Sequence, residues 1–193
     1  AIAQLLASMG PPLQGTEEVT SGMQYWPVLH FVEVWGVDHS GVTLPALKEM
    51  TRCFSAEFAV RPLLNRDLHG TLGVLSSWLG DPDPHVRRWI SEGTRPRLPW
   101  GGHLKELKRD PSPVIPLLRA LYRDPEEYVR RSVANHMNDI SKDHPDVAVK
   151  VAEDWWDESD QNTCRLVRRA LRGLIKAGHP GALALLGYGP AEG

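Results

Sequence analysis

The segment best equipped for chemistry is the loop Gly93–Gly102, which combines cationic and aromatic side chains. It contains Arg95, Arg97 and Trp100, and two prolines stiffen it. A connection between helices needs only a few polar residues, so a rigid loop that presents guanidinium groups and an indole indicates a device for a nucleic-acid ligand. The alternative is that Trp100 caps one end of the hydrophobic core.

Motifs for nucleophilic, phosphate-binding and metal chemistry are missing from the sequence. It contains no Gly-x-Ser-x-Gly elbow, no Walker loop, no Gly-x-Gly-x-x-Gly and no His-Glu-x-x-His. Its two cysteines, Cys53 and Cys164, cannot form a cysteine-based zinc site, and its eight histidines are scattered. We therefore expect any reaction to use carboxylates, arginines and aromatic side chains, without a metal or a cofactor. Such residues suit glycosidic chemistry, in which carboxylates stabilise a positively charged sugar and activate water.

The charge of the chain is nearly balanced in total but unevenly distributed. The formal net charge is −2 and the pI is about 6.5. Residues 1–60 carry a net charge of −4, whereas residues 85–110 carry +4 and residues 161–180 carry +5. Sixteen of the 22 basic residues are arginine, the side chain suited to bidentate phosphate contacts. Composition alone favours the interpretation that these regions are solvated helix faces, and the alternative is a surface for a polyanionic partner.

An internal repeat predicts the fold. Segments 81–92 and 124–135 both run from Asp-Pro into a Val-Arg-Arg triplet, 43 residues apart, and a third triplet follows at 167–169 after a further 38 residues. Helices separated by short Asp-Pro or His-Pro connections, with a period near 40 residues, are typical of HEAT and armadillo repeats. Because one helix pair cannot bury its apolar face alone, the repeats must stack. We predict an all-α protein, a HEAT-like repeat α-solenoid of stacked helical hairpins with a concave basic face.

The apolar periodicity predicts helices in eleven segments that follow an irregular connection at 10–24. These segments are 27–35, 43–52, 54–65, 69–79, 84–92, 102–109, 113–123, 126–142, 145–157, 161–177 and 180–186.

A helical wheel for segment 126–142 separates a core stripe from a polar stripe. The core stripe contains Val129, Val133, Met137 and Ile140, and the polar stripe contains Arg131, Asn135, Asn138 and Asp139. In the first repeat the equivalent polar stripe contains Arg88 and Glu92, and in the third it contains Arg169.

Stacking of the repeats would align Arg88, Arg131 and Arg169 about one helix diameter apart, a spacing suited to a polyanion backbone. The first arginines of the triplets, Arg87, Arg130 and Arg168, would lie at the edge of that face. The pattern alone does not separate a DNA or RNA cradle from a protein-binding scaffold. Arginines in such repeats often pair with acidic residues of the neighbouring repeat, and such a pair would be structural.

Two long motifs resemble a known family. Segments Ser91–Trp100 and Tyr128–Pro145 closely resemble the AlkC branch of the AlkC/AlkD-type DNA alkylation repair glycosylases, and so do Tyr25–Pro27 and Phe54–Pro62. The resemblance extends over residues 23–186. It implies a HEAT-like repeat hydrolase of DNA repair that cleaves the N-glycosidic bond of cationic N-alkylated bases, chiefly 3-methyladenine and, in this branch, 3-methylcytosine. Such a base is already a positively charged leaving group, so the enzyme must stabilise positive charge on the deoxyribose and position water.

The resemblance also implies the roles of individual residues. Glu57 and Asp139 would be the catalytic carboxylates, with Trp100 near the sugar of the lesion and Arg88 near the active site. Phosphate contacts would come from Arg95, Arg97, Arg131 and Arg169. The polar stripes add Glu92 and Asn135 to the expected DNA-binding surface. The family acts on a lesion that remains stacked in the duplex, so no deep base-binding pocket is expected.

The expected organisation is a single HEAT-like domain over residues 1–193, without the small C-terminal immunoglobulin-like domain usual in this branch. The expected partner is double-stranded DNA that contains alkylated bases, bound by a monomer. No apolar run is long enough to cross a membrane, and no signal peptide is visible. We expect a bacterial-type cytoplasmic location, associated with the nucleoid when bound to DNA. The alternative function is a non-catalytic HEAT-repeat module that binds DNA or protein.

Overall fold

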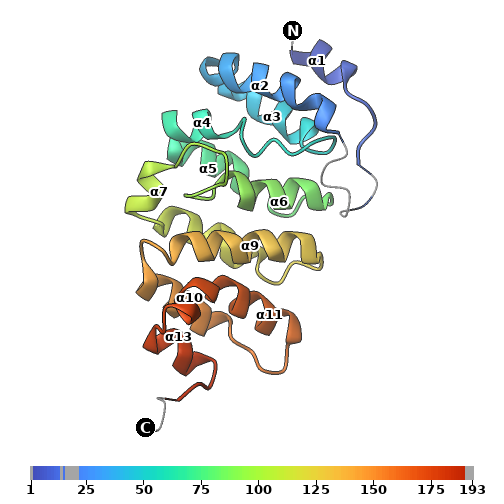
Figure 1. Ribbon diagram of the computed structural model, residues 1–193. Coiled ribbons are helices and arrows are strands. Elements are labelled where there is room, and N and C mark those ends of the chain that lie inside the picture. The colour runs from blue at the N-terminus through green and yellow to red at the C-terminus, as the bar shows by residue number, and fades with distance from the viewer. Residues whose placement is uncertain (1, 14, 16–21, 190–193) are drawn as a thin grey trace.

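The computed structural model describes residues 2–13, 15 and 22–189, which form helices and no strand. Figure 1 shows the helices stacked in successive layers from the N-terminal end of the molecule to the C-terminal end. The α-helices of this part of the chain are α1 (Ile2–Ser8), α2 (Trp26–Trp35), α3 (Ser40–Met50), α4 (Arg61–Arg66), α5 (Leu68–Ser76), α6 (Pro84–Gly93), α7 (Lys105–Arg109), α8 (Ile115–Leu121), α9 (Glu127–Ile140), α10 (Pro145–Trp155), α11 (Gln161–Ala170), α12 (Arg172–Lys176) and α13 (Pro180–Leu185). Three 3-10 helices are η1 (Met23–Tyr25), η2 (Val37–His39) and η3 (Ser112–Val114). Within these ranges, no helix has both the length and the apolar character that a membrane-spanning segment requires.

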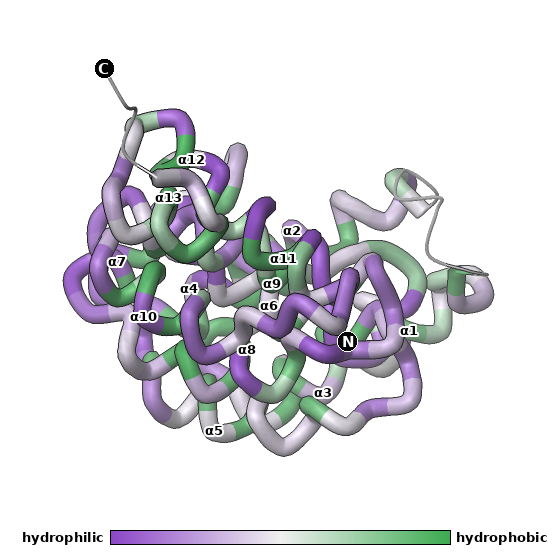
Figure 2. The backbone as a smooth tube through the Cα atoms, turned by 90° about the horizontal axis from the view of Figure 1, so that it is seen from below, coloured by the Kyte–Doolittle hydropathy of each residue, from purple (hydrophilic) through white to green (hydrophobic). Residues whose placement is uncertain are grey.

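The repeat helices form the centre of the stack. Helix α6 packs against α9, and α9 packs against α11, while α8 and α10 pack against these helices as their hairpin partners. In the view along the stack (Figure 2), α6, α9 and α11 lie over one another, and α3, α5 and α8 lie to one side of them. The predicted all-α solenoid of stacked helical hairpins is confirmed.

One continuous hydrophobic core joins the layers. Trp89 of α6 and Val129, Val133 and Met137 of α9 are completely buried in it. The predicted core stripe of segment 126–142 is therefore confirmed. Because the apolar residues of α9 contact the layers on both sides, each repeat depends on its neighbours for burial.

The Asp-Pro dipeptides begin two of the repeats with the same turn. The Oδ1 atom of Asp81 accepts the backbone N–H of Asp83 at 2.9 Å, and the Oδ1 atom of Asp124 accepts that of Glu126 at 2.9 Å. Asp83 then caps α6 by accepting the N–H of His85 at 2.8 Å. These bonds satisfy backbone donors that a helix start leaves unpaired.

The first arginine of a Val-Arg-Arg triplet ties its repeat to the next one. Arg87 donates to two carbonyls of its own Asp-Pro turn, and its Nε and Nη2 atoms donate to Asp124 of the next repeat at 2.6 and 3.0 Å. Arg130 also donates to two carbonyls of its own turn and reaches the Oδ1 atom of Asn162 at 3.4 Å. The interpretation that repeat arginines pair across neighbouring repeats is thus correct for Arg87.

We expect Asp124→Ala to lower the free energy of unfolding by about 3–5 kcal/mol, because it leaves the charge of Arg87 buried without its carboxylate counter-ion. The two side chains are only 11% and 3% exposed. Asp157→Ala is the matched control: Asp157 also accepts an amide hydrogen two residues ahead, but its partner Arg123 is 56% exposed. An exposed pair contributes at most about 1 kcal/mol. Urea unfolding curves measure both effects, and equal losses would show that the buried pair is not a tie between repeats.

Two of the predicted helices differ from the observed ones. Segment 54–65 is not one helix, because residues 51–60 form turns and irregular backbone and α4 begins at Arg61. Pro62 explains the break, since a proline inside a helix lacks the amide hydrogen and collides with the preceding turn, whereas the first turn tolerates it. Segment 161–177 is divided into α11 and α12 at Leu171, whose ψ is 5°. Helix α1 was not predicted, and part of the predicted connection 10–24 lies outside the described residues.

Candidate active site

The irregular segment before α4 contributes a carboxylate to a pocket with aromatic walls. The cavity has a volume of about 160 Å³, and its lining consists of Met23, Trp26, Phe54, Ser55, Glu57, Phe58, Arg88 and Trp100. The rings of Trp26 and Phe58 are stacked, with centroids 5.5 Å apart and planes at 3°. Glu57 is the acidic residue of this lining. The pocket therefore combines the carboxylate of Glu57 and the guanidinium group of Arg88 with several aromatic surfaces.

Glu57 is fixed by a hydroxyl and a guanidinium group. The hydroxyl of Ser55 donates to Oε2 of Glu57 at 2.8 Å. Arg88 donates from Nη1 to the same carboxylate oxygen and to the Ser55 hydroxyl, the latter at 2.7 Å. The Oε1 atom accepts no hydrogen bond from the described residues. One oxygen of a preorganised carboxylate is thus left for a ligand.

The guanidinium group of Arg88 is itself fixed by neighbouring side chains. Its guanidinium group lies 5.3 Å from the ring centroid of Tyr128. Burial disfavours its charge, but the carboxylates of Glu92 and Glu57 outweigh burial and raise the pKa of Arg88. Arg88 therefore remains cationic and its direction is fixed, which suits a residue that orients a carboxylate.

A chain of alternating charges connects the pocket to Asp139. Its members, in order, are Glu57, Arg88, Glu92, Arg95, Asp139 and Lys142. Beyond the first pair, the closest N···O distances are 3.7, 2.5, 2.8 and 3.1 Å. The two carboxylates predicted to be catalytic are 82 residues apart in the sequence. The folded chain thus places them in one electrostatic network.

Glu92 lies at the centre of this network and is buried. It accepts hydrogen bonds from Arg95 at 2.5 Å and from the Ser132 hydroxyl at 2.6 Å. Burial alone would raise its pKa, but the charges of Arg88 and Arg95 outweigh burial and hold the pKa of Glu92 below its usual value. The expectation that Glu92 lies on the DNA-facing surface does not agree with this placement.

The two arginines of the loop are both paired with carboxylates. Arg95 is buried, and its Nε donates to Asp139 at 2.8 Å. Its expected phosphate contact does not agree with this burial, because the guanidinium group is already enclosed by two carboxylates. Arg97 donates to both oxygens of Asp143 at 2.8 and 2.6 Å and remains partly exposed. A phosphate contact by Arg97 stays a prediction.

Asp139 occupies a different environment from Glu57. It is 1% exposed, its Oδ2 accepts from Arg95, and its Oδ1 accepts from Lys142 at 3.1 Å. It does not belong to the lining of the aromatic pocket. Of the two carboxylates that the resemblance implies to be catalytic, Glu57 lines the pocket and Asp139 does not, and a catalytic role for Asp139 stays a prediction.

Trp100 stands at the exposed tip of the loop. Its side chain is 93% exposed, so the alternative that it caps the core is wrong. Its φ is 63°, in the left-handed region that bulky residues rarely adopt. Such a conformation costs about 1–3 kcal/mol and persists where the surrounding structure fixes the backbone, often at functional sites. The strain therefore points to a role for the exposed indole.

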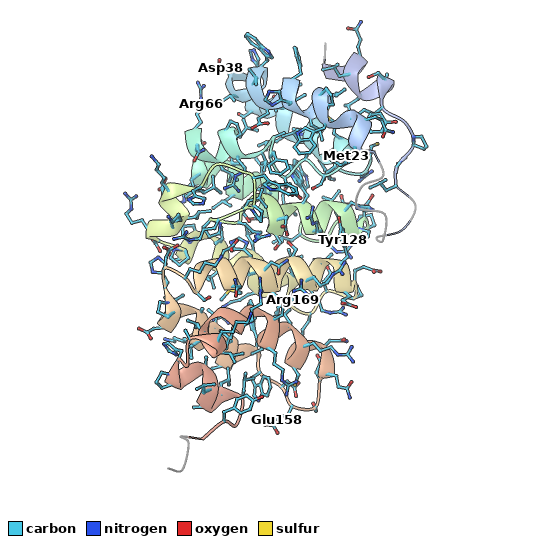
Figure 3. All side chains as sticks on the ribbon, in the orientation of Figure 1. Met23, Asp38, Arg66, Tyr128, Glu158 and Arg169 are labelled. Carbon is cyan, nitrogen blue, oxygen red and sulfur yellow. The ribbon has the colours of Figure 1, made fainter. Side chains whose placement is uncertain are left out.

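The second arginines of the later repeats line a groove between α9 and α11. Its volume is about 230 Å³, and its lining consists of Glu127, Arg130, Arg131, Ala134, Asn162, Arg165, Leu166 and Arg169. Arg169 donates to the Oδ1 atom of Asn135 at 3.2 Å. Figure 3 shows Met23, Tyr128 and Arg169 in succession from the α2 layer to the α11 layer. The groove suits the phosphate contacts expected of Arg131 and Arg169 and a supporting role for Asn135, which stay predictions.

His136 makes folding sensitive to mild acid. It is completely buried, its Nδ1 is 2.9 Å from the Ser91 carbonyl that accepts its hydrogen, and its Nε2 has no partner within the described residues. Burial, reinforced by the charge of Arg95, lowers the pKa of His136 to about 4. The unfolded chain binds this proton near pH 6.5, so stability is lost as the pH falls from 6.5 toward 4.

We expect this linkage to lower the free energy of unfolding by about 2 kcal/mol between pH 7 and pH 5. Urea unfolding at the two pH values measures the loss. In His136→Gln the loss should shrink to a few tenths of a kcal/mol, because glutamine does not titrate. The same pH dependence in the wild type and in His136→Gln would contradict this origin.

Several contributors to the site were not predicted as site residues. Five of them lie in the motifs Tyr25–Pro27 and Phe54–Pro62 that carried the family resemblance, and they are Trp26, Phe54, Ser55, Phe58 and Arg61. Membership of those motifs was the available signal. Within the part of the chain that the structure describes, no group of three or more histidine, cysteine, aspartate and glutamate side chains is arranged to hold a metal ion.

The fold and the site define a helical-repeat protein with a carboxylate held among aromatic rings and, between α9 and α11, an arginine-lined groove. No protein-family model matches the chain. Among solved structures, the Pseudomonas fluorescens alkylpurine DNA glycosylase AlkC, bound to DNA containing an abasic site analogue, is 40% identical, with a TM-score of 0.84 over 94% of this chain and 54% of that one. Among curated proteins, the uncharacterized YhaZ of Bacillus subtilis is 45% identical over 162 residues, which are 84% of this chain and 45% of that protein.

The chain therefore closely resembles the AlkC branch of the AlkC/AlkD-type proteins, in sequence and in fold, over 94% of its length. It spans about half the length of the relatives that it matches.

Proposed function

We propose that this chain contains the active site of a DNA glycosylase. Its substrate is double-stranded DNA with cationic N-alkylated bases, 3-methyladenine and 3-methylcytosine, and it hydrolyses their N-glycosidic bond without a metal or a cofactor. The observation that carries the proposal is the pocket in which the Glu57 carboxylate lies among Trp26, Phe58 and Trp100. Aromatic faces and a carboxylate both attract an organic cation. The sequence and structural likeness to an AlkC solved with abasic-site DNA supports it.

The chemistry needs only what such a pocket supplies. The bond between C1′ and the base nitrogen breaks, and both electrons pass to the base, which leaves as a neutral molecule. Positive charge develops on the sugar, where the free oxygen of Glu57 stabilises it. The oxygen of a water molecule bonds to C1′ and gives up its proton to a carboxylate. The products are the free base and an abasic deoxyribose.

The enzyme must also bind the duplex, and the groove between α9 and α11 provides a surface for this binding. Arg130, Arg131, Arg165 and Arg169 line it together with one glutamate. Such a groove favours an anionic backbone and contributes affinity that falls steeply with salt. We assign phosphate contacts to Arg131 and Arg169, and they act independently of base identity.

Base release from duplex DNA treated with a methylating agent tests the function. We expect free 3-methyladenine in the soluble fraction in proportion to enzyme, with an abasic site left in the strand. DNA oxidised instead of alkylated serves as the negative substrate. A chain that binds duplex DNA and releases no alkylated base at any enzyme concentration would be a non-catalytic DNA-binding module, and the proposal would be abandoned.

A further inference from the structure

Arg61, the first residue of α4, is a buried guanidinium group whose partners are all backbone carbonyls. It is 4% exposed and forms no ion pair with the described residues. Burial, reinforced by the charge of Arg95, lowers the pKa of Arg61 to about 10, so the group stays cationic at neutral pH. A buried charge without a counter-ion is expensive, and its donors must be well used for it to be retained.

The four hydrogen bonds of Arg61 clamp both ends of the Trp100 loop. Its Nη1 donates to the carbonyls of Gly93 and Arg95 at 3.0 and 2.9 Å. Its Nε donates to the carbonyl of Gly102 at 2.9 Å, and its Nη2 donates to the same oxygen. The planar guanidinium group of Arg61 therefore fixes both ends of the loop, and the exposed tip of the loop projects between them.

The absence of a side chain at Gly101 makes room for this clamp. A Cβ atom at that position would lie 3.3 Å from Nε and 3.4 Å from Cδ of Arg61. It would also lie 3.3 Å from Cδ2 of Leu98, so these neighbours would have to shift by a few tenths of an ångström to accept it. The loop is also tied elsewhere, by the Arg97–Asp143 pair and by the buried side chain of Leu98. Those ties run to the turn after α9 and to the core, whereas the clamp runs to α4.

The clamp joins the two walls of the pocket. Arg61 follows Glu57 and Phe58 in the same short segment, and it grips the loop that carries Trp100. A second cavity of about 240 Å³ borders the same wall, and Trp26, Phe58, Arg61 and Trp100 are among its lining residues. Empty space next to the loop means that Trp100 has room to move when the clamp is absent.

We propose that Arg61 is a positioning residue, which sets the spacing between Glu57 and Trp100 and acts through the loop. It touches neither the reacting atoms nor the phosphates. The rate effects below rest on the proposed glycosylase function, whereas the loop itself can be observed without any activity.

Hydrogen exchange of the backbone amides of residues 94–102 tests the clamp directly. In Arg61→Gln we expect the amides of the loop to exchange at least about tenfold faster. The reason is that the equilibrium constant between the closed and the open loop falls about tenfold. Arg61→Lys should behave in the same way, since one ammonium group cannot bridge carbonyls at both ends. The matched control is Arg66→Gln, which removes an exposed arginine one turn along α4 that pairs with Asp38, both labelled in Figure 3. Wild-type exchange of the loop in Arg61→Gln would overturn the proposal.

A double-mutant cycle tests whether Arg61 acts through Trp100. We expect Arg61→Gln and Trp100→Ala each to slow single-turnover base release at least about tenfold, and the double variant to be no slower than the slower single one. Multiplication of the two effects would mean that Arg61 acts by another route and would overturn the proposal. If Arg61→Gln does not fold, Gly101→Ala replaces it, because the added methyl crowds the guanidinium group without removing it. If the wild type releases no base, the glycosylase function is refuted. Hydrogen exchange alone then tests whether Arg61 holds the loop in place.

Discussion

Glu57→Gln is expected to slow the release of 3-methyladenine from alkylated duplex DNA by about 10²–10³-fold. The substitution keeps the size of the side chain and an oxygen that can accept from Ser55 and Arg88. It removes the negative charge that would stabilise the developing positive charge on the sugar. In an apolar pocket that charge is screened less than in water, so its loss weighs heavily. Single-turnover release at saturating enzyme measures the chemical step without product dissociation.

Duplex binding separates this role from a role in affinity. Removal of a negative charge from a DNA-facing pocket should leave binding to unmodified duplex unchanged or slightly tighter, because one repulsion is lost. Glu49→Gln is the matched control, since it removes an equal charge from the exposed end of a side chain on α3. Release by Glu57→Gln within threefold of the wild-type rate would contradict the assignment of this carboxylate to catalysis.

The repeat explains why the fold could be predicted from the sequence. Asp81 and Asp124 each accept the backbone N–H of the residue two positions ahead. Arg87 and Arg130 each donate to the backbone carbonyl of the aspartate in their own turn. A pattern that fixes the same local bonds twice specifies a stack of similar units. The prediction of a helix over 54–65 was wrong because it gave too little weight to Pro62. That error concerned the segment that carries Glu57.

The candidate site could be predicted only in part, because its geometry depends on distant segments. A helical wheel gave α9 one core face and one polar face, whereas α9 lies between two layers and is buried on both sides. Asn138 therefore accepts the amide hydrogen of Gly173 at 3.2 Å instead of facing solvent. Similarly, Arg95 and Arg97 find Asp139 and Asp143 across separations of 44 and 46 residues. The local signal for the network was the spacing of Arg88 and Glu92 on one face of α6, with Arg95 three residues further on in the loop.

Asp139→Asn is expected to have the largest combined effect, on stability and on activity. Asp139 is 1% exposed and balances the buried charge of Arg95. Its neutralisation leaves that charge short of a partner and should lower the free energy of unfolding by about 3–5 kcal/mol. Lys142→Met is the matched control, because Lys142 contacts the other oxygen of Asp139 from an exposed position and should contribute at most about 1 kcal/mol.

A loss of activity in Asp139→Asn does not by itself separate catalysis from support. The double variant Arg95→Met with Asp139→Leu does, because it removes both charges and fills the same volume with apolar groups. Replacement of a buried ion pair in this way is often neutral or stabilising, so we expect unfolding in urea to return to within about 1 kcal/mol of the wild type. If Asp139 takes part in the reaction, base release stays at least about 100-fold below the wild-type rate in this stable variant. If release recovers with stability, Asp139 only supports the network, and catalysis rests on Glu57.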